Sequence, residues 1–245
     1  MITAERQGNV SVLRMDYAKV NVIDLEFMTA IAESVRAVPP TDAIVLTGNG
    51  RAFSAGVNLK RLLEGGLEYT TEFLDMLSGA VLEVFLHPRP VVAAIDGHAI
   101  AGGFILAAAC DLRLMSAGLT GMTELKVGVP IPSILREIAR HSLGHYTQSL
   151  VLTGDLIDAQ RAYEIGFLDA VVEPEKLLDA AIERASALAA VPAATYALTK
   201  RTLKFEAVQR MQDAGPEFDT EIRATWHDPM IRAGIAEYLA SISRK

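Results

Sequence analysis

The chain has 245 residues, of which 51% are hydrophobic and 22% are charged, and its formal net charge is −7. This composition allows one large or two small domains around a sizeable core. The acidic balance argues against a broad nucleic-acid-binding surface, which needs clustered lysine and arginine. The single cysteine, Cys110, excludes an internal disulfide and a metal site built from several cysteines.

The apolar segments and histidine spacings of the sequence predict neither a targeting signal, a membrane span nor a metal site. The start, MITAERQGNVSVL, lacks the long apolar segment of a secretory signal. The longest uncharged apolar run, 99–110, is too short to cross a bilayer. The five histidines show no spacing typical of metal ligands. We therefore expect a cytoplasmic protein with no bound metal and with neither nucleic acid nor membrane as a partner.

Predicted strands and helices alternate along the first two thirds of the chain. Five segments have the apolar patterns of strands: 9–15, 43–48, 91–96, 112–116 and 170–173. Three segments have helical periodicity: 24–38, 71–86 and 158–166. Asp24 and Asp158 stand at the starts of two of these helices, where they are typical N-caps. The alternation predicts an α/β layered fold.

After Pro174 the periodicity is helical only. The expected helices are 174–191, 193–212, 216–226 and 230–244. A helical tail of this length is hard to bury against its own core alone. We therefore expect it to pack on a neighbouring subunit.

Two short turns share one pattern. GRAFSAG (50–56) and GHAIAGG (97–103) both read G-x-A-x-x-[AG]-G, and each follows an apolar strand. Small residues allow close approach to the backbone, and a helix that begins at such a turn points its first N–H groups outward. The equivalent positions Ala55 and Gly102 would supply two donors, the composition of an oxyanion hole for a carbonyl substrate. On residue types alone, two tight structural turns are an equally good interpretation.

Other turn-based activities fit these residues poorly. GHAIAGG lacks the Lys-Ser or Lys-Thr of a phosphate-binding P-loop and the G-x-G-x-x-G of a dinucleotide-binding turn. Ser54 does not lie in G-x-S-x-G, which disfavours a serine hydrolase.

The two turns also carry a family resemblance. FSAGVNL (53–59) and PVVAAIDGHAIAGGFILAAACDLRLMS (90–116) resemble the paired signature of the crotonase superfamily, the enoyl-CoA hydratase/isomerase family. The match continues through TELKVGVPIP (123–132), SLVLTGDLIDAQRAYEIGFLDAVV (149–172) and ALTKRTL (197–203), in the family's order.

The resemblance implies an α/β, crotonase-like spiral core of ββα turns over residues 1–190. It implies an all-helical C-terminal trimerisation region over residues 191–245, in a homotrimer or a dimer of trimers. The substrate would be an acyl-CoA thioester, with no cofactor apart from the coenzyme A of that substrate. The resemblance also places the oxyanion-hole donors at the backbone N–H groups of Ala55 and Gly102.

One departure from the family pattern bears on the reaction. Hydratases of this family usually carry two glutamates, but the first of these positions is Ile105 here, and the second is Glu124. Syn-hydration needs two groups to position and protonate water, whereas a double-bond shift needs a single acid/base. The chain therefore looks closest to the monofunctional Δ3,Δ2-enoyl-CoA isomerases, with Glu124 as the sole acid/base.

Alternatives to the isomerase stay open. A weak enoyl-CoA hydratase, or another crotonase-type lyase or hydrolase, fits a single glutamate. A trimer that binds CoA esters without catalysis is the alternative outside the enzymes. A second acid could come from Glu64, Glu68 or Asp75, in a segment that often covers such pockets.

Local basic groups are needed to bind the phosphates of coenzyme A. Lys60 and Arg61, directly after the first turn, are the preferred candidates, with Lys19 and the turn residue Ser54 as further binding candidates. Asp111 is interpreted as structural, either paired with Arg113 or capping a turn.

Overall fold

The computed structural model describes residues 1–242, apart from the side chain of Ala214. Its main sheet has six strands in the order β1 (Ile2–Gln7), β2 (Val10–Met15), β3 (Ala43–Thr47), β5 (Val91–Ile95), β7 (Leu112–Met115) and β10 (Ala170–Val171). Neighbouring strands are parallel except for the β1–β2 hairpin. β3 and β5 are buried along their whole length, as their continuous apolar runs predicted.

A second, smaller sheet contains four short strands. Their order is β4 (Ala52–Ser54), β6 (His98–Ile100), β8 (Leu119–Gly121) and β9 (Ile157–Asp158).

Helices lie on and between these sheets. They are α1 (Leu25–Arg36), α2 (Leu59–Leu86), α3 (Gly102–Ala109), α4 (Glu124–Val127), α5 (Ser133–Leu143), α6 (Thr147–Thr153), α7 (Ala159–Glu164), α8 (Leu177–Ala189), α9 (Ala193–His227) and α10 (Pro229–Ile242). Two 3-10 turns occupy Gly144–Tyr146 and Pro174–Lys176. The predicted caps are confirmed, because the carboxylates of Asp24 and Asp158 accept from the backbone of Phe27 and Arg161.

The chain repeats one unit three times. A main-sheet strand, a short strand of the second sheet and a helix follow one another as β3–β4–α2, β5–β6–α3 and β7–β8–α4. This confirms the predicted α/β spiral of ββα turns. Each short strand carries the chain to a turn, and two of these turns are the glycine-containing turns noted in the sequence.

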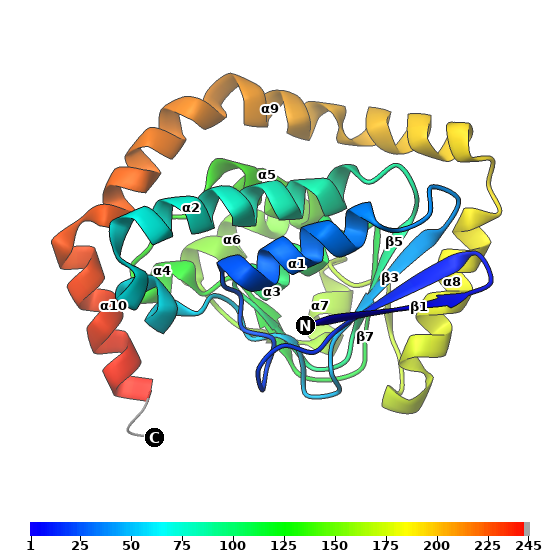
Figure 1. Cartoon of the computed structure of the whole chain (residues 1–245), viewed down its shortest axis with the longest axis horizontal. Helices are drawn as coiled ribbons and strands as arrows, with labels where there is room; N and C mark the ends of the chain where they lie inside the picture. The colour runs from blue at the N-terminus through cyan, green and yellow to red at the C-terminus, as the bar shows by residue number, and fades with distance from the viewer. Residues whose placement is uncertain (243–245) are drawn as a thin grey trace.

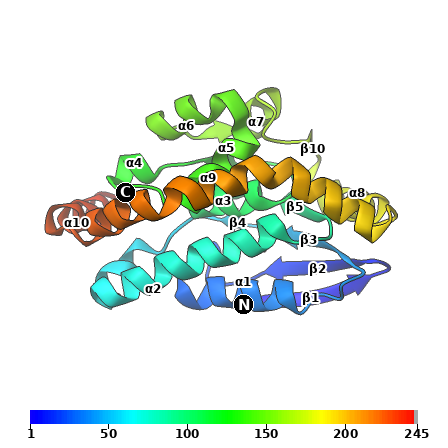
Figure 2. The same cartoon turned by 90° about the horizontal axis from the view of Figure 1, so that it is seen from above.

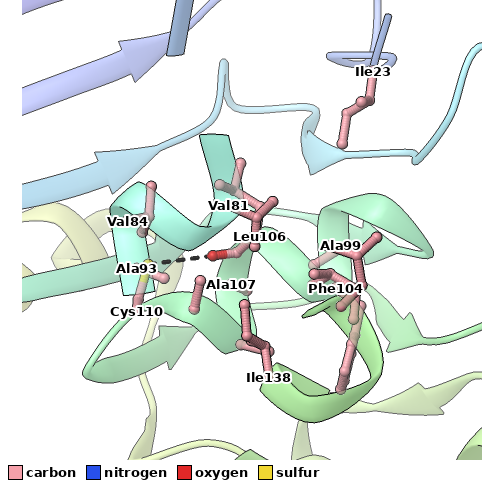
Figure 3. Close-up of a cluster of buried hydrophobic side chains, with 14 of the residues drawn as sticks. Ile23, Val81, Val84, Ala93, Ala99, Phe104, Leu106, Ala107, Cys110 and Ile138 are labelled. Atoms are coloured by element: carbon pink, nitrogen blue, oxygen red, sulfur yellow. Dashed lines mark hydrogen bonds between the residues drawn. The ribbon is translucent and has the colours of Figure 1, made fainter. Parts of the chain in front are cut away.

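Helix α3 forms the centre of the core, and every residue in it is buried. Figure 3 shows Phe104, Leu106 and Ala107 packed near Val81 of α2 and Ile138 of α5. The Cys110 thiol at its end donates to the Leu106 carbonyl over 3.5 Å. Burial raises the pKa of that thiol to about 12, so it is an inert core residue.

The C-terminal region contains fewer helices than expected. The separate helices predicted at 193–212 and 216–226 are wrong, because α9 is continuous and contains Pro216. A proline removes one backbone donor from a helix interior. Contacts with α5 on both sides of it hold α9 in place: Arg210 pairs with Glu137 at 2.7 Å, and Asp219 accepts from the Ser133 amide at 2.8 Å.

The helical tail packs on its own chain. In Figures 1 and 2, α9 runs across α2 and α5, and α10 turns back beside α2 and α4. These contacts bury part of the helical tail within the chain, and its packing on a neighbouring subunit stays a prediction. Four large apolar side chains of α9 nevertheless remain exposed: Leu198, Leu203, Phe205 and Phe218.

Asp111 fastens α9 to the core. Asp111 is structural, as predicted, but the expected pairing with Arg113 is wrong. Its carboxylate accepts from the ammonium groups of Lys200 at 2.7 Å and Lys204 at 2.9 Å, and from the backbone amide of Val91 at 2.9 Å. All three side chains are nearly buried, so each charge depends on the others for compensation. The expectation failed because both lysines lie about ninety residues further along the chain.

No helix within residues 1–242 is both long enough and apolar enough to cross a membrane.

Candidate active site

A cavity of about 410 Å³ lies between the two glycine-containing turns, the start of α2, α4 and the C-terminal helices. Four residues predicted for the site line it: Ala55, Lys60, Gly102 and Glu124. The rest of its wall is mostly apolar, including Phe73, Leu74, Leu77, Val129, Leu135, Trp226 and Leu239. The cavity therefore combines a few polar groups with a largely apolar surface, as small-molecule sites commonly do.

The geometry of the second turn explains why it contains two adjacent glycines. Ala101 has φ +52°, a conformation that a non-glycine residue rarely adopts. Gly102 then begins α3, and its amide forms no hydrogen bond within residues 1–242. A Cβ on Gly103 would lie 2.5 Å from the carbonyl oxygen of Ser54. Gly102 thus has a free amide at the cavity, whereas Gly103 allows the two turns to pack together.

The first turn requires a correction to the expected donor. The Ala55 amide is not free, because it donates to the Val20 carbonyl at 3.0 Å. The Gly56 carbonyl accepts from Ile23 at 2.8 Å, and the Asn58 amide donates to the Ile23 carbonyl at 2.7 Å. Between these paired groups, the amide of Val57 has no hydrogen-bond partner in the described chain.

Val57 also lines the cavity. The unpaired donor of the first turn is therefore two residues beyond the one predicted. The sequence signal, FSAGVN, contains Val57 but does not show which amide the segment at 20–23 occupies.

The prediction that Ser54 is a binding residue is wrong. Its side chain is fully buried, and its hydroxyl donates to the Asn21 carbonyl at 2.7 Å and accepts from the Gly56 amide at 3.1 Å. Ser54 stabilises the turn and does not face the cavity.

The predicted basic residues differ in their placement. Lys60 lines the cavity, and its largely exposed side chain lies 3.7 Å from Glu64. Arg61 turns away from the cavity to pair with Glu26 at 3.0 Å and to lie over the ring of Tyr69. Lys19 is exposed and lies outside the cavity wall. Of these three candidates, the geometry favours Lys60 alone.

Glu124 begins α4 and is the only carboxylate among the described residues that line the cavity. Its Oε2 atom is buried and has no hydrogen-bond partner among the described residues. Burial raises the pKa of this carboxyl from its ordinary value of 4.5 to about 7. A carboxyl group with this pKa can both accept and return a proton near neutral pH.

The other candidate acids do not reach the cavity. Glu64, Glu68 and Asp75 are absent from its wall, and Glu64 and Asp75 form ion pairs with Lys60 and Arg223. Ile105 is fully buried inside α3 and does not line the cavity either. Among the described residues, no three His, Cys, Asp or Glu side chains are placed together to hold a metal ion.

The C-terminal helices contribute residues that the sequence did not suggest. Trp226 of α9 donates its indole N–H to the Pro130 carbonyl at 3.0 Å, and Tyr238, Leu239 and Ile242 of α10 complete the wall. No motif marked these residues, because only the return of α10 to the core brings them to the cavity.

Comparison with known proteins agrees with this architecture. The model of the enoyl-CoA hydratase/isomerase family matches residues 5–241. The chain belongs to this family. A Thermus thermophilus protein named putative enoyl-CoA hydratase is 33% identical over 212 residues, which cover 83% of each chain.

Solved structures of family members have the same fold. One, described as an enoyl-CoA isomerase of Mycobacterium tuberculosis, is 28% identical, with a TM-score of 0.75 and coverage of 98% of this chain and 97% of its own. The human mitochondrial Δ3-Δ2-enoyl-CoA isomerase gives a TM-score of 0.92 with coverage of 99% and 98%, but at 22% identity it supports the fold alone. This protein is thus an enoyl-CoA hydratase/isomerase family enzyme, and the names of its relatives include both activities.

Proposed function

We propose that the protein is an isomerase that converts 3-enoyl-CoA esters into 2-enoyl-CoA esters. The observation that carries this proposal is that Glu124 is the single carboxylate among the described residues that line a largely apolar cavity. Adding water across a double bond needs a second acid/base group. At the position where hydratases of the family usually carry their other glutamate, this chain has Ile105, which is apolar and buried in the core. Moving a double bond needs one group that takes a proton and returns it.

The proposed reaction has two proton transfers. The Glu124 carboxylate takes a proton from C2 of the substrate, and the electrons of that C–H bond move into a dienolate whose charge lies on the thioester oxygen. The amides of Val57 and Gly102 donate to this oxygen, and each such donor typically contributes 10²–10³ in rate. Glu124 then gives the proton to C4, so the double bond moves from C3–C4 to C2–C3 and no atoms are gained or lost.

The cavity wall supports this use of one glutamate. Apolar side chains exclude water, which disfavours hydration as a side reaction and keeps the pKa of Glu124 near that of an effective base at neutral pH. Lys60 is the proposed contact for a phosphate of coenzyme A. The acyl chain would occupy the buried end, near Phe73, Leu77 and Trp226.

The assembly remains part of the proposal. A homotrimer or a dimer of trimers would cover the exposed apolar side chains of α9. Measurement of the particle mass in solution by light scattering would test this assembly.

A direct assay tests the reaction. The purified protein is incubated separately with a 3-enoyl-CoA and a 2-enoyl-CoA, and double-bond migration and water addition are measured by chromatography. We expect migration without appreciable water addition. Dominant water addition would make the protein a hydratase, and a protein that binds octanoyl-CoA without either reaction would be a non-catalytic CoA-ester-binding protein.

A further inference from the structure

Helix α2 is broken near its start. Gly66 has φ +76° and ψ −166°, which are not helical values, so α2 consists of an entry segment, 59–65, and a long helix after it. Such a break removes the intrahelical partners of carbonyls just before it. The entry segment therefore needs other donors for its last carbonyl groups.

Arg232 of α10 supplies donors to two of these carbonyls, and the Thr70 hydroxyl also donates to that of Leu62 at 3.5 Å. The Nη2 atom of Arg232 donates to the carbonyls of Leu62 at 3.3 Å and Leu63 at 3.1 Å, and its Nη1 donates to the hydroxyl of Thr70 at 3.4 Å. Leu62 and Leu63 precede the break and Thr70 follows it, so one guanidinium joins both parts of α2. A cation at the C-terminal end of a helical segment is also favoured by the helix dipole.

The two elements that Arg232 joins are both walls of the cavity. Leu59 and Lys60 of the entry segment line it, as do Tyr238, Leu239 and Ile242 of α10. Arg232 and Leu239 are seven residues apart and share one face of α10. Ile235, between them on the same face, is buried. This face of α10 is therefore directed at α2 and at the cavity.

We propose that Arg232 is a positioning residue that latches α10 to the entry segment of α2 and keeps the cavity closed around Glu124. A second contact lies at the same corner, where the Thr71 hydroxyl is 3.0 Å from Nε2 of His227. The latch excludes water from the cavity, and its release lets the entry segment and α10 separate. This role of Arg232 in closing the cavity does not depend on which reaction the cavity catalyses.

The only tryptophan of the chain makes closure measurable without an activity assay. Trp226 lines the cavity, and only 4% of its surface is exposed. Arg232→Met removes the donors and keeps the length of the side chain. Arg223→Met is the matched control, because Arg223 also joins the C-terminal helices to α2, through Asp75, but does not touch the break.

We expect quenching of Trp226 fluorescence by acrylamide to increase in Arg232→Met and to stay at the wild-type level in Arg223→Met. Amide hydrogen exchange in 59–65 and 229–242 should become about tenfold faster in Arg232→Met, because hydrogen bonds from a charged donor are lost. Arg232→Lys keeps the charge but not the fork of donors, so it should fall between wild type and Arg232→Met.

Unchanged quenching and exchange in Arg232→Met would overturn the proposal. A loss of protection spread over the whole chain would also overturn it, because that pattern marks general destabilisation. If Arg232→Met does not fold, the same two measurements on Arg232→Lys decide the matter. A failure of the isomerase assay would leave these readouts unaffected.

Discussion

Replacing Glu124 by glutamine should abolish the double-bond shift and, at the same time, stabilise the folded chain above neutral pH. Glutamine has nearly the same shape as glutamate but cannot accept and return the proton. The wild-type carboxyl has a pKa raised by burial, so the folded protein binds its proton more tightly than the unfolded chain does. The stability of the wild type should therefore fall as pH rises between about 4.5 and about 7.

The size of the effect follows from the pKa. A rise from 4.5 to about 7 corresponds to at most about 3 kcal/mol, at 1.36 kcal/mol for each tenfold change in the ionisation constant. Glu124→Gln lacks this ionisation. The free energy of unfolding of the variant should thus match that of the wild type near pH 4.5 and exceed it by up to about 3 kcal/mol near pH 8.

Urea unfolding at several pH values between these limits measures the difference. Glu64→Gln is the control, because Glu64 is mostly exposed and lies outside the cavity, so this substitution removes a carboxylate without changing the buried site. In the active wild type, kcat/KM should decline as pH falls through about 7, because the base must be ionised to accept a proton. A stability difference that does not vary with pH, or near-wild-type turnover by Glu124→Gln, would refute the reasoning.

Three further substitutions test other parts of the structure. Lys60→Glu should weaken octanoyl-CoA binding about tenfold by calorimetry, since a charge-assisted contact is lost, whereas Lys19→Glu should leave it unchanged; equal effects would contradict the placement of the phosphate contact at Lys60. Leu77→Trp fills the buried end of the cavity and should lower kcat/KM for 3-dodecenoyl-CoA about tenfold relative to 3-hexenoyl-CoA, and an unchanged ratio would show that the acyl chain lies elsewhere. Asp111→Asn leaves two buried ammonium groups without a counter-charge and should lower the free energy of unfolding by about 3 kcal/mol in urea, and a loss below about 1 kcal/mol would mean that the network contributes little.

Local sequence patterns determined much of the fold. Continuous apolar runs gave the buried strands β3 and β5, and capping aspartates gave the starts of α1 and α7. These features depend on residues that are close in sequence, so hydrophobic periodicity and capping chemistry are sufficient to predict them. The short strands of the second sheet had no comparable signal, because two or three residues are too few for a pattern.

The sequence by itself also determined the chemical groups of the candidate site, namely the glycine-containing turns, Glu124 and the apolar residue at position 105. Only the tertiary structure decided which of these groups are free. The Ala55 amide is paired and the Val57 amide is not because the segment at 20–23 runs beside the turn. Likewise, Arg61 forms an ion pair with Glu26 and does not line the cavity. Helix α9 continues through Pro216, and contacts with α5 hold it on both sides of this proline. Hydrogen bonds and ion pairs between distant segments decide such outcomes, and no local pattern records them.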